Sequence, residues 1–385
     1  MDFETTEEHE QIRRAVREIC ADFPGEYWRE LDAARRYPSE FVAALTAGGW
    51  LAALIPEEYG GIGVGVLEAS IILEEIHRSG GNAAACHAQM YIMGTLLRHG
   101  TEEQKRRWLP GIASGALRLQ AFGVTEPNAG SDSTRIETRA VREGDGYVLN
   151  GQKIFTSRFQ HSDLMLLLAR TSDYEEADRA GNLSVFMVDL AEAGDAVKAT
   201  PLETMVNHET SVVHIEGLRI PASNRIGEEG RGFRYILGGM NAERILIAAE
   251  CIGDARFFID RAAAYASERI VFDRPIGQNQ GVQFPIAWVY AQTEAADLMR
   301  LKAAARFDAG LPAGPEANMA KLLASEASWA AANACMDTFG GYGMATEYDI
   351  ERKFRETRLY QVAPVTNNLV LAYLGNKVLG MPKSY

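Results

Sequence analysis

The spacing of apolar residues changes twice along the chain, and this change limits the possible folds more than any other feature. From about residue 2 to 119, apolar side chains recur every three or four residues, as in Ile12 and Val16, which predicts helices. From about residue 120 to 227, short apolar runs alternate with turn residues, which predicts strands. The helical period returns from about residue 233 onward.

These three stretches predict an α+β multi-domain protein. We expect an N-terminal α-helical domain over residues 1–119, a central β-barrel-like domain over 120–227 and a C-terminal four-helix bundle over 228–385. In the central stretch, GYVLNGQKIFTS (146–157) predicts two strands joined by an Asn-Gly turn, because this dipeptide tolerates positive φ. Further strands are expected over 163–170, 183–190 and 211–216.

Four helices with short connections are expected in the C-terminal stretch, and such connections favour antiparallel packing. The first of them carries an apolar stripe that includes Ile245, Ile252 and Ile259. Pro364 fits the first turn of the last one, where a helix needs no N–H from that residue. The expected helices span 240–268, 281–309, 315–338 and 364–379.

Charge and composition exclude several classes of partner. A net charge of −13 repels phosphate backbones and anionic lipids, so we expect neither nucleic acid nor membrane as a partner. The four cysteines lie far apart without a CxxC pair, and no histidine cluster has metal-ligand spacing, which predicts inert thiols and no metal. The N-terminal MDFETTEEHEQ is unlike a signal peptide, and the apolar run 164–169 is too short to span a bilayer. A cytoplasmic location is therefore expected.

Motifs for several common enzyme classes are missing from the sequence. No GxGxxG follows a predicted strand and no GxxxxGK[ST] occurs, which argues against a Rossmann domain and a P-loop. The absence of GxSxG disfavours a serine hydrolase. What remains is AFGVTEPNAGSDS (121–133), a turn rich in backbone donors, hydroxyls and small residues. Such a turn can approach a flat polar ring closely, although an ordinary surface turn has the same composition.

This turn is also the first point of resemblance to a known family. GVTEPNAGSD closely resembles the TEPxAGSD signature of the acyl-CoA dehydrogenases. IPEEYGG, NGQKIFTS, ERIVFDRPIGQNQ and FGGYGM resemble four further segments of that family, in its order and spacing across essentially the whole chain. Each segment alone is weak evidence for the family, but five segments in the same order and spacing are specific evidence. The resemblance implies a three-domain fold and FAD as the cofactor.

The resemblance also implies which residues bind FAD. One group would lie along the pyrimidine edge of the flavin, a second would cover the other side of the ring with Ser157 near N5, and a third would bind the diphosphate and adenosine from a neighbouring subunit. The three groups are Phe122, Val124 and Thr125, then Phe155, Thr156 and Ser157, and then Arg269, Phe272 and Gln280. Asp337, Gly341, Thr366, Asn368 and Ser131 match further cofactor positions, and Ser131 also matches a substrate contact.

The position of the catalytic base is the most specific question that the sequence raises. Most members of the family carry a glutamate in a YEGT-like segment near the C-terminus, but here Pro364 stands at that position and cannot accept a proton. A smaller branch, similar to the isovaleryl- and long-chain-type enzymes, carries the glutamate on the long helix before an arginine. Glu243 and Arg244 match that arrangement, and Asn241 matches a CoA contact. The resemblance thus implies Glu243 as the base, although a first-turn carboxylate is also favoured by the helix dipole alone.

Pro364 has a second consequence. In the family, the backbone N–H at this position helps to polarise the thioester carbonyl, and proline has none. Loss of such a donor costs about 2.7–4 kcal/mol of transition-state stabilisation if nothing replaces it, so we expect a neighbouring donor such as the Val365 N–H to take its place. Ala363 stands where many relatives have a bulky aromatic residue, which favours a branched or cyclic acyl group.

The function implied by the resemblance is FAD-dependent α,β-dehydrogenation of an acyl-CoA thioester, with an electron-transferring flavoprotein as the acceptor. FAD contacts from a neighbouring subunit imply at least a dimer, and the family usually forms a homotetramer that is a dimer of dimers. Two alternatives remain open: a flavin-dependent monooxygenase or oxidase of the same fold, and a non-catalytic relative that keeps FAD as a structural ligand.

Overall fold

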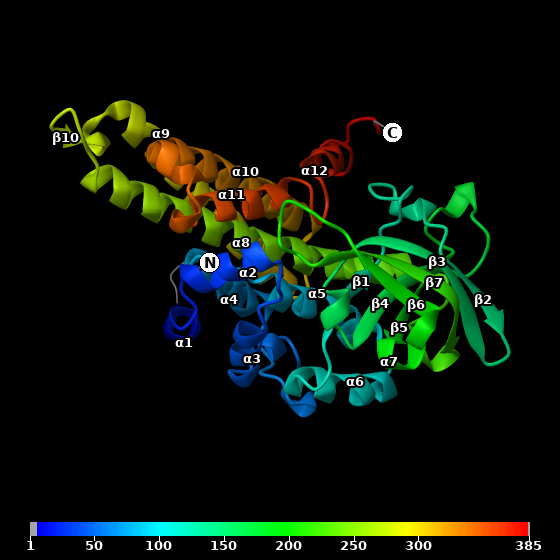
Figure 1. The fold of residues 1–385 in the computed structure, drawn as a ribbon. Helices are drawn as coiled ribbons and strands as arrows, with labels where there is room; N and C mark the ends of the chain where they lie inside the picture. The colour runs from blue at the N-terminus through cyan, green and yellow to red at the C-terminus, as the bar shows by residue number, and fades with distance from the viewer. Residues whose placement is uncertain (1–5, 384–385) are drawn as a thin grey trace. The chain divides into compact units, whose positions relative to one another are not determined.

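The computed structural model describes residues 6–383 and confirms the predicted order of a helical N-terminal part, a central sheet and a helical C-terminal part (Figure 1). The first five residues of the predicted N-terminal domain lie outside the described residues. The N-terminal helices are α1 (Glu7–Ala21), α2 (Gly25–Ala34), α3 (Ser39–Ala47), α4 (Val66–Arg78), α5 (Ala84–His99) and α6 (Glu102–Ser114). The strands are β1 (Leu119–Gly123), β2 (Arg139–Glu143), β3 (Gly146–Ser157), β4 (Leu164–Arg170), β5 (Leu183–Asp189), β6 (Val197–Pro201), β7 (Thr210–Pro221) and β8 (Arg225–Ile226), with α7 (Leu190–Ala193) after β5. The C-terminal elements are α8 (Gly232–Glu268), β9 (Ile270–Val271), β10 (Arg274–Pro275), α9 (Gln280–Asp308), α10 (Gly314–Phe339), α11 (Ile350–Arg358) and α12 (Asn367–Tyr373).

The chain forms two compact units, and each is described separately below. The helical unit comprises the described parts of Met1–Ala34, Gly65–Ala83 and Asn241–Tyr385. The sheet unit comprises Arg35–Val64 and Ala84–Met240. The division falls inside α8, so the long helix contributes residues to both ranges.

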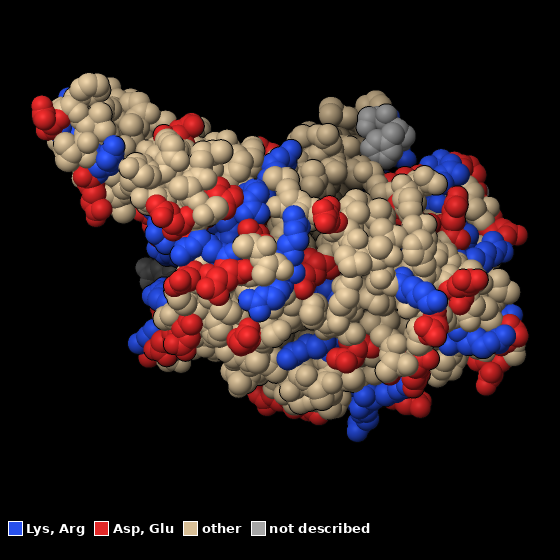
Figure 2. Space-filling model, in the orientation of Figure 1, with Lys and Arg blue, Asp and Glu red and all other residues tan. Residues whose placement is uncertain are grey.

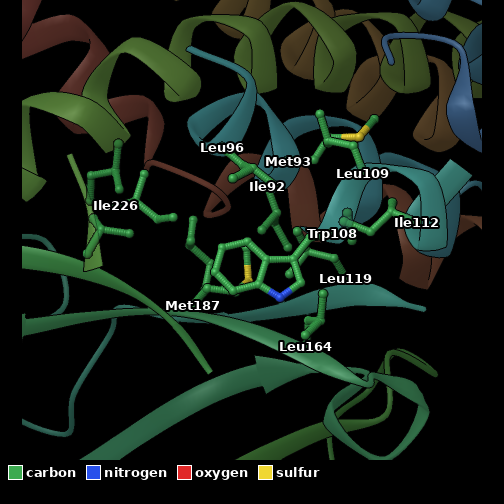
Figure 3. Packing of buried hydrophobic residues seen from close by; sticks show 14 of the residues in the cluster. Ile92, Met93, Leu96, Trp108, Leu109, Ile112, Leu119, Leu164, Met187 and Ile226 are labelled. Atoms are coloured by element: carbon green, nitrogen blue, oxygen red, sulfur yellow. The ribbon is translucent and has the colours of Figure 1, made fainter. Parts of the chain in front are cut away.

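One sheet forms the frame of the sheet unit. Its strands follow the order β6-β7-β3-β2-β4-β5-β8, and β1 pairs in parallel with β4. The predicted strand over 163–170 is confirmed as β4, which is buried along its whole length because apolar side chains cover both of its faces. Figure 3 shows the cluster between the sheet and the helices: Ile92, Met93 and Leu96 of α5 and Trp108, Leu109 and Ile112 of α6 pack with Leu164 of β4 and Met187 of β5.

The predicted hairpin over 146–157 is wrong, because these residues form the single strand β3. Asn150 and Gly151 lie at a shift in register between β3 and β7 instead of in a turn. The Asn150 side chain accepts a hydrogen bond of 2.7 Å from the Gly217 N–H, which satisfies a donor on the neighbouring strand. A Cβ at Gly151 would lie 2.4 Å from the Thr138 side chain. Glycine is needed here because the chains approach closely in a β-bulge. In the sequence, such a glycine cannot be told from the glycine of a tight turn.

The helical unit packs α8, α9 and α10 side by side (Figure 1). The predicted apolar stripe of α8 is confirmed for Ile245 and Ile252, both fully buried, and Ile259 packs against the core as a partly buried residue. The alanines near the middle of α10, such as Ala331 and Ala332, are buried within this unit and bring the helices close together. The short connections thus produce the packing that the sequence predicted.

The predicted last helix, 364–379, is wrong at its beginning. α12 starts at Asn367, because the Thr366 side chain caps it by accepting a hydrogen bond of 3.3 Å from the Leu369 N–H. Pro364 therefore precedes the helix instead of lying in its first turn, and the Ala363–Pro364 peptide bond is cis. A further helix, α11 over Ile350–Arg358, was not expected from the sequence.

Other expectations concern the described part of the chain as a whole. All four cysteines are buried and free, as predicted. Within residues 6–383, no helix is long and apolar enough to cross a membrane, and no cluster of three or more potential ligands could hold a metal ion. On the face shown in Figure 2, Lys and Arg side chains lie among Asp and Glu side chains.

Candidate active site

In the sheet unit, strands β1 and β3 bring two of the predicted FAD-binding groups together. The Ile154 N–H donates to the Thr125 carbonyl over 2.9 Å, and the Lys153 ammonium donates to the Val124 carbonyl over 3.2 Å. Phe122 at the end of β1 contacts the ring of Tyr91 edge-on, with centroids 5.7 Å apart. The segment 122–125 therefore lies beside the segment 155–157.

A buried ion pair fixes this arrangement, and the sequence did not reveal it. Glu126 accepts a bond of 2.8 Å from Lys153 and further bonds from the backbone of Glu137 and from both the backbone and the hydroxyl of Thr138. Burial lowers the pKa of Lys153 to about 8, although Glu126 acts in the opposite direction. Burial raises the pKa of Glu126, but Lys153 and these hydrogen bonds outweigh it and lower the pKa overall. Both residues stand inside motifs that were recognised, and their role is to hold the turn in place.

Thr156 and its neighbours differ strongly in their surroundings. The Thr156 side chain is 0% exposed, and its hydroxyl has no hydrogen-bond partner among the residues that the structure describes. Phe155 is 58% exposed and has a φ of 58°, in the left-handed region that few non-glycine residues adopt. The Ser157 hydroxyl shares a hydrogen bond of 3.0 Å with the Thr210 hydroxyl. Ser131 is exposed in the turn that follows β1.

In the helical unit, α8 carries the predicted base. Glu243 is only 5% exposed and precedes Arg244, which is half-buried and donates a bond of 3.3 Å to the Asn241 side chain. Burial lowers the pKa of Arg244, while Glu243 and Tyr373 act in the opposite direction. The helix thus places a buried carboxyl group, a guanidinium and an amide within one turn.

The segment that contains Ala363 and Pro364 is held against α10 by a buried lysine. Lys321 is fully buried and donates to the Val365 carbonyl over 2.8 Å and to the Asn367 side-chain oxygen over 2.7 Å. Burial lowers the pKa of Lys321 to about 8; Cys251 opposes this effect and Arg244 adds to it. Sequence inspection gave no reason to select Lys321 or Asn367, because their partners are distant in sequence or are backbone atoms.

The remaining predicted residues lie elsewhere in the helical unit. Arg269 follows the end of α8 and places its guanidinium 5.8 Å from the centre of the Tyr342 ring. A helix rises 1.5 Å per residue, so Arg269 lies roughly 39 Å along the axis from Glu243. The structure therefore does not bring these two residues together within one chain. Phe272 and Gln280, from the same predicted group as Arg269, are exposed. The further predicted positions Asp337, Gly341 and Asn368 are exposed as well.

Comparison with known proteins identifies the family. The N-terminal, middle and C-terminal domain models of acyl-CoA dehydrogenase match residues 6–116, 121–217 and 230–377. The chain belongs to the acyl-CoA dehydrogenase family. It is 36% identical over 390 residues to acyl-CoA dehydrogenase fadE12 of Mycobacterium bovis, covering 100% of this chain and 99% of that protein.

Two further relatives place the chain within this family. It is 32% identical to the cyclohex-1-ene-1-carbonyl-CoA dehydrogenase of Syntrophus aciditrophicus, covering 98% of this chain and 91% of that protein. The solved butyryl-CoA dehydrogenase of Megasphaera elsdenii has a TM-score of 0.93 at 28% identity and covers 98% and 100% of the two chains. As an acyl-CoA dehydrogenase, this protein is a flavoprotein oxidoreductase that acts on acyl-CoA and depends on FAD.

The residues of the sheet unit fit this cofactor. A buried hydroxyl without a partner is unfavourable, and a polar ring atom beside Thr156 would satisfy it. The exposed ring of Phe155 offers a flat apolar surface that a flavin would cover. The residues present would therefore fit a flavin, and its binding by residues 122–125 and 155–157 stays a prediction.

Proposed function

We propose that this acyl-CoA dehydrogenase uses Glu243 to remove the α-proton of its substrate. The observation that carries the proposal is the place of this carboxyl group: it is 5% exposed on the long helix and adjoins Arg244, while residue 364 is a proline. Burying a carboxyl group is costly, so such a group needs a specific role or partner. Bound FAD would accept the hydride from the β-carbon, and all other steps fall to residues of the chain.

The protein must also stabilise the negative charge that develops on the thioester oxygen. Because Pro364 lacks an N–H, the donor comes from a nearby residue. The N–H of Val365 is the first one after the proline, and it has no hydrogen-bond partner among residues 6–383. We assign it the role of polarising the acyl carbonyl. Removing such a donor costs about 2.7–4 kcal/mol in other enzymes, which sets the scale of what the Val365 N–H must supply.

The acyl group is proposed to be branched or cyclic. Ala363 has a small side chain and lies directly before Pro364, which leaves room near the α- and β-carbons. A relative named cyclohex-1-ene-1-carbonyl-CoA dehydrogenase supports a ring-bearing substrate. The highest kcat/KM for straight-chain butyryl-CoA or octanoyl-CoA in an acyl-CoA panel would contradict this part of the proposal.

The exposed residues beyond α8 support an assembly of several subunits. Phe272 is 94% exposed, and Arg269 lies too far along α8 from Glu243 to serve one compact site in the same chain. We infer that Arg269, Phe272 and Gln280 contact FAD bound to a neighbouring subunit in a homotetramer. An electron-transferring flavoprotein is the proposed electron acceptor, and a cytoplasmic location stays a prediction.

Replacement of Glu243 by glutamine tests the base directly. We expect Glu243→Gln to retain FAD but to lose about 10²- to 10⁴-fold in the rate of flavin reduction, because the amide cannot accept the proton. The measurement is an anaerobic titration of the FAD-loaded protein with an acyl-CoA panel, followed by flavin absorbance. Glu268→Gln at the exposed end of α8 is the matched control and should reduce at the wild-type rate. Unimpaired reduction in Glu243→Gln would end the assignment.

The same titration separates the two alternative functions. A monooxygenase or oxidase would need oxygen to form product and would not depend on Glu243. A non-catalytic relative would hold FAD that no acyl-CoA reduces.

A further inference from the structure

The segment 361–367 is fastened to α10 at both of its ends. The Gln361 amide donates to the Ser325 carbonyl over 2.7 Å. The Asn367 amide donates to the side-chain oxygens of Gln361 over 3.1 Å and of Glu326 over 2.7 Å. Ser325 also exchanges hydrogen bonds with the Asn367 side chain. These bonds form a clamp around Pro364, so the backbone there takes its shape from α10.

Lys321 lies at the centre of this clamp and differs from the other lysine and arginine side chains that are less than 2% exposed. Each of the others has a carboxylate within ion-pair distance: Lys153 has Glu126, Arg300 has Glu74 and Asp297, Arg352 has Asp349 and Glu356, and Lys353 has Asp254 and Glu356. Lys321 is 0% exposed, and its hydrogen-bond partners are a carbonyl and an amide oxygen, with no carboxylate within 4.0 Å among residues 6–383. Desolvating an ammonium for two neutral acceptors is unfavourable for stability alone. Another benefit must therefore favour a lysine at this position.

We propose that Lys321 is a positioning residue that orients the backbone of residues 363–367 toward the acyl carbonyl. This inference rests on the proposed function, because the Val365 N–H is the donor that it aims. Lys321 holds the carbonyl of Val365, which is joined to the Val365 N–H through a single Cα. Gln361 and Asn367 fasten the chain on the two sides of this residue, so the direction of the Val365 N–H is restricted. A donor fixed before the reaction needs no reorganisation as charge develops on the acyl oxygen. The positive charge of Lys321 also stabilises negative charge on the acyl oxygen, and this effect is stronger in a region without bulk water.

The surroundings of Lys321 connect the clamp to the helix that carries the base. Cys251 and Arg244, both on α8, influence the pKa of Lys321, and Glu326 on its own helix does so as well. Arg244 directly follows Glu243 in the chain. The charge of Lys321 is thus coupled to groups on the helix that carries the proposed base, while its hydrogen bonds hold the segment after Pro364.

The test uses the full-length, FAD-loaded protein with Lys321→Met, which fills a similar volume without donors or charge. Lys302→Met is the control, because Lys302 is a partly exposed lysine of α9 that pairs with Glu316. Three quantities are measured: the dissociation constant of the acyl-CoA, the rate of flavin reduction, and exchange of the α-proton with D₂O followed by mass spectrometry. The exchange measurement uses an acyl-CoA analogue with sulfur in place of the β-carbon, which has no β-hydride to transfer.

We expect Lys321→Met to slow α-proton exchange and flavin reduction by roughly tenfold to hundredfold, since misplacing a catalytic group by about 1 Å can cost 10²-fold. The dissociation constant should change far less, because the CoA moiety does not depend on the clamp. Lys321→Gln, which keeps a donor for Val365, should recover part of the rate, and it replaces the methionine variant if that one fails to fold or to retain FAD. Wild-type exchange in a folded Lys321 variant, or a loss confined to acyl-CoA affinity, would overturn the inference. A wild-type protein that neither exchanges the α-proton nor is reduced would instead refute the proposed function, and this inference with it.

Discussion

The two units bury charge in different ways. In the sheet unit, apolar side chains cover both faces of the sheet, and Figure 3 shows those on the face toward α5 and α6. The Lys153–Glu126 pair is a buried ion pair beside the turn that follows β1. In the helical unit, whole clusters of charge lie between helices. Glu74 contacts Arg13, Arg256 and Arg300. In another cluster, Glu356 accepts bonds from Arg352 and Lys353.

This contrast gives a criterion for the role of a buried charge. Where opposite charges meet, as around Glu74 and Glu356, each desolvated group gains a partner and the cluster can serve the fold alone. Lys321 lies in the same unit but has neutral partners in the segment that follows Pro364. We therefore take a fully buried lysine without a carboxylate partner as the better indicator of function, and the following predictions test that distinction.

Acid should affect the helical unit most. Burial raises the pKa of Glu74 and Glu356, but their arginine and lysine neighbours outweigh it and bring each pKa from 4.5 down to about 2. A depressed pKa stabilises the fold above pH 4.5, and that stability is lost as the pH falls toward 2. Each carboxyl group should contribute roughly 3 kcal/mol, so about 6 kcal/mol is at stake in this unit.

To measure this loss, the protein is titrated with denaturant at several pH values between pH 6 and pH 3. Each sample then receives a pulse of hydrogen exchange at one fixed pH, and the labelled peptides report on the two units separately. Peptides of α4 and α11 should lose protection before those of β3 and β4. Glu74→Gln should flatten the pH dependence of the α4 peptides. If β4 lost protection at the same pH as α11, the proposed difference between the units would be wrong.

Removal of Lys153 from its ion pair should lower the free energy of unfolding more than removal of Lys321 from the clamp. Lys153→Met leaves the Glu126 carboxylate buried without a cation, and breaking a buried pair in this way costs about 3–5 kcal/mol. Lys321→Met leaves only neutral oxygens without a donor, which costs about 1–3 kcal/mol. Denaturant unfolding of the two variants gives both free energies. The double variant Lys153→Met with Glu126→Gln should recover part of the first loss, and equal losses in the two single variants would remove the distinction.

The fold was predictable wherever the buried face of an element is apolar. The stripe of α8 and the apolar run of β4 gave correct elements, because hydrophobic periodicity reports burial directly. α11 escaped prediction because the side chains that it buries include Arg352, Lys353 and Glu356, which read as a solvated surface. The Asn-Gly pair in β3 gave the wrong element, since a close approach between strands needs the same glycine as a turn does.

The candidate site shows the same limit. Motifs in the sequence selected Thr156 and Glu243 as candidates, and Pro364 indicated that the glutamate expected at its position is missing. Lys321 could not be found this way, because its partners are a backbone carbonyl and the side chain of Asn367, forty-six residues later. A sequence gives the charge of a residue but not the groups that surround it after folding.

The smallest expected effect comes from Ser325, whose hydroxyl contacts Asn367 inside the clamp. Ser325→Ala should cost about 1 kcal/mol, the usual value of one hydrogen bond, because Asn367 keeps its bonds to Lys321, Glu326 and Gln361. Ser328→Ala, one turn further along α10, removes a buried hydroxyl that contacts Thr357 and should cost about the same.

The two serine variants should nevertheless differ in chemistry. Ser325→Ala loosens the segment after Pro364 and should slow α-proton exchange measurably, whereas Ser328→Ala leaves the clamp intact and should exchange at the wild-type rate. Denaturant unfolding and the exchange assay on both proteins make the comparison. Equal exchange rates at equal stability would show that the clamp supports the fold only, and that the neutral partners of Lys321 have no bearing on the reaction.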